Sequence, residues 1–339
     1  RPWPLARETN SPSTSHSTFP AATSSAEIAL LHPHGPWSLR LPRGSRAGGG
    51  AFGLFELTAP MDIEVRAGFT IRWVDIRPLS AGIRPVIAAD HASFRFRLDR
   101  VLPLTIEFNG EIKRVIHLFA YAPEKDAPKP GDPHVTYFGP GVHNPGVIEA
   151  LEGETIYLAP GAWVKGAIRS YGAKNITIRG RGVLDAGSLP PRGDPALQPR
   201  ARPGIPAPAQ YGGGGRNVIY LEKTEGAKIE GITLFNAPTW TLYLKSATGT
   251  HIDGIRILSW SAQCTTDGID IVSSSNTLVE NVFIRSNDDC IAVKNMDNVD
   301  QSNITVRNSV FWNMAATRWR SVSRCAARKP RRCASTTST

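Results

Sequence analysis

Three aspartates in the second half of the chain have the spacing of an acid–base centre. Asp267 lies in the segment TTDGIDI. The adjacent Asp288 and Asp289 lie in SNDDCIAVK, and Asp288 follows Asp267 by 21 residues. Carboxyl groups held close together repel one another, which raises the pKa of one while the others stay ionised. Hydrolysis of a glycosidic bond with inversion needs a protonated donor and an ionised base about 6.5 to 9.5 Å apart. Aspartates are also frequent turn residues, so their spacing alone leaves a structural role open.

The aspartates belong to a repeating pattern that predicts how they are positioned. Short I-x-G or V-x-N segments begin at Ile178, Ile229, Ile252, Val279 and Val306, at steps of 51, 23, 27 and 27 residues. A period in the twenties is typical of a parallel β-helix, in which successive coils stack on one another. We interpret the step of 51 as about two turns. A β-sandwich with chance periodicity is the alternative. In a β-helix, stacking would bring the first aspartate beside the aspartate pair.

Composition changes along the chain predict further segments around this β-helix. Residues 1–25 are rich in Ser, Thr and Pro and are expected to form a disordered lead-in. Residues 37–121 hold short alternating segments, such as FGLFEL and DIEVRA, that indicate a β-sandwich, and 122–133 is a predicted linker. The β-helix is expected over 134–315, with a Pro- and Gly-rich loop insertion at 186–217. The predicted fold is therefore all-β, an N-terminal β-sandwich followed by a right-handed parallel β-helix that is truncated at its C-terminus.

Charge is distributed unevenly between the body of the chain and its last residues. The formal net charge is +10, but seven basic and no acidic residues fall in 316–339, so residues 1–315 carry 32 basic and 29 acidic side chains. This nearly balanced body gives no reason to expect a nucleic-acid partner. The longest apolar runs are far shorter than a membrane-spanning helix requires.

The segments around the aspartates resemble a known family. NAPTWTLYL, TTDGIDI and SNDDCIAVK, in this order, are similar to the NSPxWT, NTDG and GDDCIAIK motifs of glycoside hydrolase family 28, the polygalacturonases. HVTYFGPGVH and ETIYLAPGAWVKGAI, preceded by a β-sandwich, look more like the related family 49, the dextranase and isopullulanase group. The resemblance covers about residues 52–314. It implies an inverting glycoside hydrolase that acts on a polysaccharide, either pectin-like or an α-glucan.

The resemblance also implies roles for individual residues. Asp288 matches the general acid of the family, and Asp267 and Asp289 match the carboxylates that hold the attacking water. Asn287 stands where many polygalacturonases have Gly, and we include it among the candidate substrate-binding residues. Asp270 follows Asp267 by three residues, so strand alternation predicts that it faces away from the site.

Two further residues are candidates for substrate binding, each with an alternative. Lys294 follows the aspartate pair at strand spacing and could reach the substrate or form an exterior charge. Trp240 could stack on a sugar ring or fill the core. Cys264 and Cys290 flank the aspartate motifs and are expected to be structural, as buried thiols or as a disulfide.

The resemblance has consequences for cofactors, partners and location. It implies no metal or organic cofactor, a polysaccharide partner, no nucleic-acid or membrane partner, and a monomer. A polymeric substrate implies secretion to the extracellular space or the periplasm, although no signal segment is visible in the chain. A β-helix polysaccharide lyase, which would need a calcium cluster, and a non-catalytic carbohydrate-binding solenoid are the alternatives.

The last residues suggest an altered reading frame. Residues 316–339 have no hydrophobic period, and a basic disordered tail is the simple interpretation. If GC-rich codons are assumed and one G is restored before the codon of Ala316, the new frame reads GNALEIGFE, which has strand character. We therefore expect a frameshifted, non-native tail and a truncated, impaired hydrolase.

Overall fold

The computed structural model describes two units of almost purely β structure. It covers residues 26–32, 35–40, 51–112, 115–197, 215–259, 265–297, 299–313 and 319–323. The chain divides into Arg1–Lys125 and Asp126–Thr339. Within the described ranges, the regular structure is β-strand apart from 3₁₀ turns at Leu79–Ala81 and Pro195–Leu197. No helix in the described part of the chain has the length and apolarity needed to cross a membrane.

The first unit contains two facing sheets around a shared apolar core. One sheet has the order β2 (Gly35–Arg40), β1 (Ala26–His32), β4 (Met61–Ala67), β7 (Ser93–Leu98), β6 (Val86–Ile87), and its pairs are antiparallel. The other has the order β3 (Ala51–Glu56), β9 (Val115–Tyr121), β8 (Pro103–Phe108), β5 (Val74–Arg77). Alternate residues of β7 are buried, and Phe94 packs edge-on against Phe108 of β8. This packing of two inner faces confirms the predicted β-sandwich.

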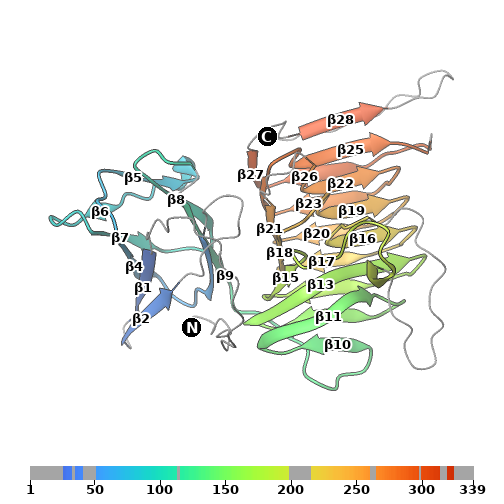
Figure 1. The fold of residues 1–339 in the computed structure, drawn as a ribbon, viewed down its shortest axis with the longest axis horizontal. Coiled ribbons are helices and arrows are strands. Elements are labelled where there is room, and N and C mark those ends of the chain that lie inside the picture. The colour runs from blue at the N-terminus through green and yellow to red at the C-terminus, as the bar shows by residue number, and fades with distance from the viewer. Residues whose placement is uncertain are drawn as a thin grey trace, which may run out of the picture. The chain divides into compact units, whose positions relative to one another are not determined.

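The second unit is the predicted parallel β-helix, with three strands in each full coil (Figure 1). After β10 (Val135–Phe138), β11 (Gly141–Glu149), β12 (Thr155–Leu158) and the long β13 (Ala162–Tyr171), the coils follow one another in chain order. They are β14 (Thr177–Gly180), β15 (Val183–Asp185), β16 (Ile219–Glu222); β17 (Lys228–Glu230), β18 (Thr233–Phe235), β19 (Leu242–Lys245); β20 (His251–Asp253), β21 (Arg256–Ser259), β22 (Ile269–Val272); β23 (Thr277–Glu280), β24 (Phe283–Ser286), β25 (Ile291–Asn295); and β26 (Ile304–Arg307), β27 (Val310–Asn313), β28 (Trp319–Ser323).

The strand register explains the repeat seen in the sequence. Ile178 pairs with Ile229, and the pairing continues through Ile252 and Val279 to Val306 on the neighbouring strands. The interpretation of the 51-residue step as two turns is wrong, because β14 pairs directly with β17. The additional residues lie between β15 and β16, at one corner of a single coil. The predicted insertion 186–217 falls at this corner, and its residues 198–214 lie outside the described ranges.

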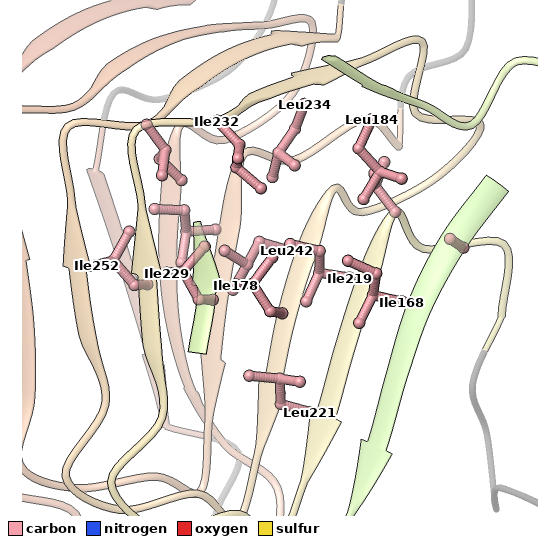
Figure 2. Close-up of a cluster of buried hydrophobic side chains, with 14 of the residues drawn as sticks. Ile168, Ile178, Leu184, Ile219, Leu221, Ile229, Ile232, Leu234, Leu242 and Ile252 are labelled. Carbon is pink, nitrogen blue, oxygen red and sulfur yellow. The ribbon is translucent and has the colours of Figure 1, made fainter. Parts of the chain in front are cut away.

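Stacked aliphatic side chains fill the inside of the coils. Figure 2 shows Ile178, Ile229 and Ile252 on neighbouring strands of one wall, with Ile219 and Leu242 on the adjacent wall. All five are fully buried. Burying an aliphatic side chain of this size contributes about 1.5 to 3 kcal/mol, and each coil adds a similar set. The outward positions of the same strands are therefore free to carry polar chemistry.

The end of the chain is described only in part. β28 pairs in parallel with β25, so residues 319–323 extend the stack by one strand. The rest of the predicted tail, 316–318 and 324–339, lies outside the described residues, and the predicted lead-in 1–25 does too. The frameshift hypothesis remains a prediction.

Candidate active site

The turns that precede β22 and β25 bring the predicted aspartates together. The Gly268 amide donates a hydrogen bond to the Asp289 carbonyl oxygen at 2.8 Å, and the Thr241 amide donates to the Asp267 carbonyl oxygen at 2.8 Å. Two residues before the paired Leu242, Ile269 and Ile291, the matching positions of three successive coils are therefore Trp240, Asp267 and Asp289. A Cβ atom on Gly268 would lie 2.3 Å from the Cys290 carbonyl oxygen, so only glycine permits this close stacking.

The loop that carries Asp288 is fixed by its own hydrogen bonds. The Asp288 Oδ1 atom accepts from the Asp289 amide at 3.0 Å, while its carbonyl oxygen accepts from Ser286 Oγ at 2.7 Å and from Asn313 Nδ2 at 2.5 Å. Asp288 and Asn287 are half-buried, whereas Asp289 is buried. Asp288 is thus the most accessible of the three predicted carboxyls, because Asp267 is buried as well.

Lys294 lies at the centre of the cluster rather than at its edge. Its Nζ atom donates to Asp267 Oδ2 at 3.2 Å and contacts Asp270 Oδ1 still more closely. The same atom lies over the Trp240 ring, 3.6 Å from its centroid. The two predicted alternatives for Lys294 are contact with the substrate and a charge on the exterior. Neither describes its position fully, because protein encloses most of the lysine and only 16% of its side chain is exposed.

Asp270 is part of the site, and the expectation that it faces away is wrong. Its carboxyl group is fully buried beside that of Asp267, and both contact Lys294. The alternation rule failed because Asp267 lies in the turn before β22, outside the regular strand. The clue that could have identified Asp270 is its outward position between Ile269 and Ile271, the two core-facing residues of β22.

Burial and mutual repulsion shift the titration of the two aspartates. Burial raises the pKa of Asp267 to about 6, against the opposing effect of Lys294, and the charges of Asp288 and Asp289 raise it further. Burial raises the pKa of Asp270 well above its usual value, and the neighbouring Asp267 adds to this. The negative charges of Asp288 and Asp289 thus favour the protonated form of Asp267.

Aromatic rings line the neighbouring strands on the same outer face. Trp240 packs edge-on against Tyr243, with ring centroids 5.1 Å apart, and Tyr243 packs against Tyr220 at 4.9 Å. Tyr220 donates a hydrogen bond from its hydroxyl group to Glu222 Oε2 at 2.5 Å, and Lys245 forms an ion pair with Glu222 Oε1 at 3.2 Å. Trp240 is half-buried and faces Lys294, so it is a wall residue of the site rather than part of the interior core.

The cysteine prediction is tested only at one position. Cys290 is a buried thiol whose Sγ atom lies 3.3 Å from Ser286 Oγ, whereas Cys264 lies outside the described residues. Within the ranges that the structure describes, no three Asp, Glu, His or Cys side chains are arranged to hold a metal ion.

The segment that carries these aspartates matches known proteins. Residues 210–311 match the model of glycosyl hydrolases family 28. Over 77 residues, 23% of the chain, the sequence is 38% identical to a "Probable polygalacturonase" from Vitis vinifera, and over 164 residues, 45% of the chain, it is 28% identical to a polygalacturonase from Cryptomeria japonica. The matched segments span 16% and 29% of the lengths of those two proteins.

Among solved structures, Dex49A from Penicillium minioluteum shares the fold. The TM-score is 0.59 at 16% identity, and the alignment covers 97% of this chain and 80% of Dex49A. The described part of the second unit is thus a parallel β-helix, as in Dex49A. Residues 210–311, which include the clustered carboxyls, carry the family 28 signature, and the relatives named above are polygalacturonases, so the predicted resemblance is confirmed.

Proposed function

We propose that this protein hydrolyses the glycosidic bonds of a polysaccharide with inversion of configuration. The observation that carries the proposal is the stacking of the Asp267 turn on the Asp289 turn, with Asp288 beside them in the same electrostatic cluster. Inversion needs an acid on one side of the bond and a base with its water on the other. A cluster of carboxyls with different exposure can supply both.

The residues take the following roles in the proposed reaction. Asp288, the most accessible carboxyl, donates its proton to the oxygen of the leaving sugar as the bond to the anomeric carbon breaks. Asp267 and Asp289 hold a water molecule and accept its proton as the water oxygen bonds to the anomeric carbon from the opposite face. The product has the inverted configuration, and proton exchange with solvent restores Asp288.

The charges beside the site bear on the choice of polysaccharide. An acidic galacturonan would require cations that can bind its carboxylates, but Lys294 and Lys245 are both paired with acids of the protein. As far as the described residues of the site are concerned, this pairing favours an uncharged α-glucan as the substrate over a pectin-like one. Because a polysaccharide does not cross a cell membrane unaided, we also propose an extracellular or periplasmic location, and we propose that the protein acts as a monomer.

Replacement of Asp288 tests the assignment of the acid. The Asp288→Asn variant should lose about 10²- to 10⁴-fold in kcat/KM on a natural polysaccharide, because no proton reaches the leaving oxygen. On an aryl oligosaccharide with a nitrophenolate leaving group, which needs no proton, the loss should be less than about tenfold. The Asp267→Asn variant should lose activity on both substrates, since it lacks the base.

The experiment includes a matched control and a clear contradictory result. Asp253→Asn, in β20 on a different wall of the β-helix, should leave both activities unchanged. Reducing ends should be measured over a panel of glycans, for the chain as printed and for the version with the restored frame. Equal losses of Asp288→Asn on both substrates would contradict its role as acid, and unsaturated products would indicate a lyase.

A further inference from the structure

Asp270 is a buried acid that the proposed hydrolysis does not use. Its side chain is fully enclosed, and its position in β22 pairs with Tyr243 of β19 and with Ala292 of β25. The charged groups that face it are Asp267, in the turn before its own strand, and Lys294, which reaches over from β25. A buried carboxylate needs partners for both of its oxygen atoms.

The hydrogen bonds around this pair of acids are incomplete if both are ionised. Lys294 serves Asp267 Oδ2 and Asp270 Oδ1, whereas Asp267 Oδ1 and Asp270 Oδ2 are buried and find no donor among the described residues. Two ionised carboxylates would also exceed the single positive charge of Lys294. One shared proton removes both problems, because the protonated carboxyl becomes a donor to the other.

The surroundings indicate which of the two acids keeps the proton. Asp270 is more deeply buried than Asp267, and burial disfavours the ionised form. The raised pKa of Asp270 agrees with this order. Burial is the largest cause of the rise in the pKa of Tyr243 to about 12, so Tyr243 stays neutral and does not compete for the proton. Asp288 and Asp289 act on Asp267 from the neighbouring turn.

We propose that Asp270 is a positioning residue that stays protonated, donates a hydrogen bond to Asp267, and with its second oxygen holds the Lys294 ammonium over Trp240. This inference rests on the proposed function, in which Asp267 is an ionised base. Asp270 contacts the base and the lysine rather than the substrate. It would keep Asp267 ionised and correctly oriented by giving it one neutral donor and one cationic donor.

Two substitutions of Asp270 separate this role from a catalytic one. Asp270→Asn keeps a neutral donor and an acceptor in place, so kcat/KM and its pH profile should stay close to those of the wild type. Asp270→Val has a similar size but no hydrogen bonds, and kcat/KM should fall about 10²-fold because Asp267 and Lys294 lose their positions. A loss in Asp270→Asn as large as in Asp270→Val would overturn the proposal.

The pH dependence of unfolding gives a readout that needs no activity. A carboxyl that stays protonated in the folded protein but ionises when unfolded stabilises the fold at low pH, and this contribution is lost as pH rises. Between about pH 4.5 and pH 7.5, the urea midpoint of the wild type should therefore fall relative to that of Asp270→Asn. Asp253→Asn should follow the wild type. Parallel curves for wild type and Asp270→Asn would also overturn the proposal.

The two readouts distinguish failure of this inference from failure of the proposed function. If Asp288→Asn keeps full hydrolytic activity, the assignment of the acid fails, while the unfolding curves still decide whether Asp270 is protonated. If the unfolding curves are parallel while Asp288→Asn behaves as expected, only the role of Asp270 is refuted.

Discussion

At the scale of single residues, Lys294 controls the charge of the carboxyls it contacts. Its ammonium group lies within 3.2 Å of Asp267 and is the main influence that opposes the burial-driven rise in the pKa of that acid. Most of the lysine is enclosed, so solvent screens this interaction less than it would a surface pair. The pH range in which the site is active therefore depends on Lys294, a residue that transfers no proton in the proposed reaction.

Removal of this charge should move the acidic limb of the pH profile. In the wild type, Asp267 ionises at about pH 6, and activity should rise through that pH because the base must be ionised. Lys294→Met removes the cation, so the pKa of Asp267 should rise and the limb of kcat/KM should move to higher pH by about one unit. Lys245→Met is the control, because Lys245 forms its ion pair with Glu222 and not with Asp267. An unmoved limb in Lys294→Met would refute the coupling.

At the scale of the element, the turn before β22 sets the distance between the acidic residues. Gly268 lies between Asp267 and the strand, where an added Cβ would meet the Cys290 carbonyl oxygen at 2.3 Å and Ile284 Cγ2 at 2.6 Å. Neither neighbour can move easily, because one is backbone and the other is part of the core. The coils would have to separate locally at this turn.

Gly268→Ala should therefore reduce both stability and activity. We expect a loss of about 1 to 3 kcal/mol in the free energy of unfolding from overpacking, and about a 10²-fold loss in kcat/KM from displacement of Asp267. Gly139→Ala is the matched control, because its Cβ would lie 3.6 Å from Tyr137 Cε1, an ordinary contact. Urea unfolding and kinetics of both variants check this, and wild-type values for Gly268→Ala would be the contrary result.

The elements of the β-helix could be predicted from the sequence further than the site could. The repeat from Ile178 to Val306 identified the paired inward residues correctly, because inward positions must be apolar in every coil, but it counted the 51-residue coil as two. Asp270 was excluded because the two-residue period of strands was applied across a turn, where it does not hold. The position of Lys294 depends on side-chain packing between coils, and sequence spacing contains no information on that.

At the scale of the whole molecule, the chain consists of two units with separate cores. The apolar cluster of the β-sandwich and that of the β-helix contain no residue in common. The chain passes from one unit to the other at Lys125 and Asp126, which are both exposed. The segment between β9 and β10 contains no regular strand.

Limited proteolysis should cut the molecule at this boundary. Trypsin cleaves exposed, irregular segments first, so a cut after Lys125 should release the β-sandwich and the β-helix as two stable fragments. Mass spectrometry of a short digest identifies the site, and Lys125→Gln should abolish this cut. Early cleavage inside β16 to β25 instead would show that the β-helix is the less stable unit.

The corner between β15 and β16 shows how this architecture can acquire new specificity. Ile178 and Ile229 keep the same pairing as residues in much shorter coils, although 51 residues separate them. The number of residues in the loop at this corner therefore does not affect how the strands of neighbouring coils pair. Peptides could be grafted between Asp185 and Ile219 without altering the frame that holds the acids, which makes this corner an entry point for directed evolution.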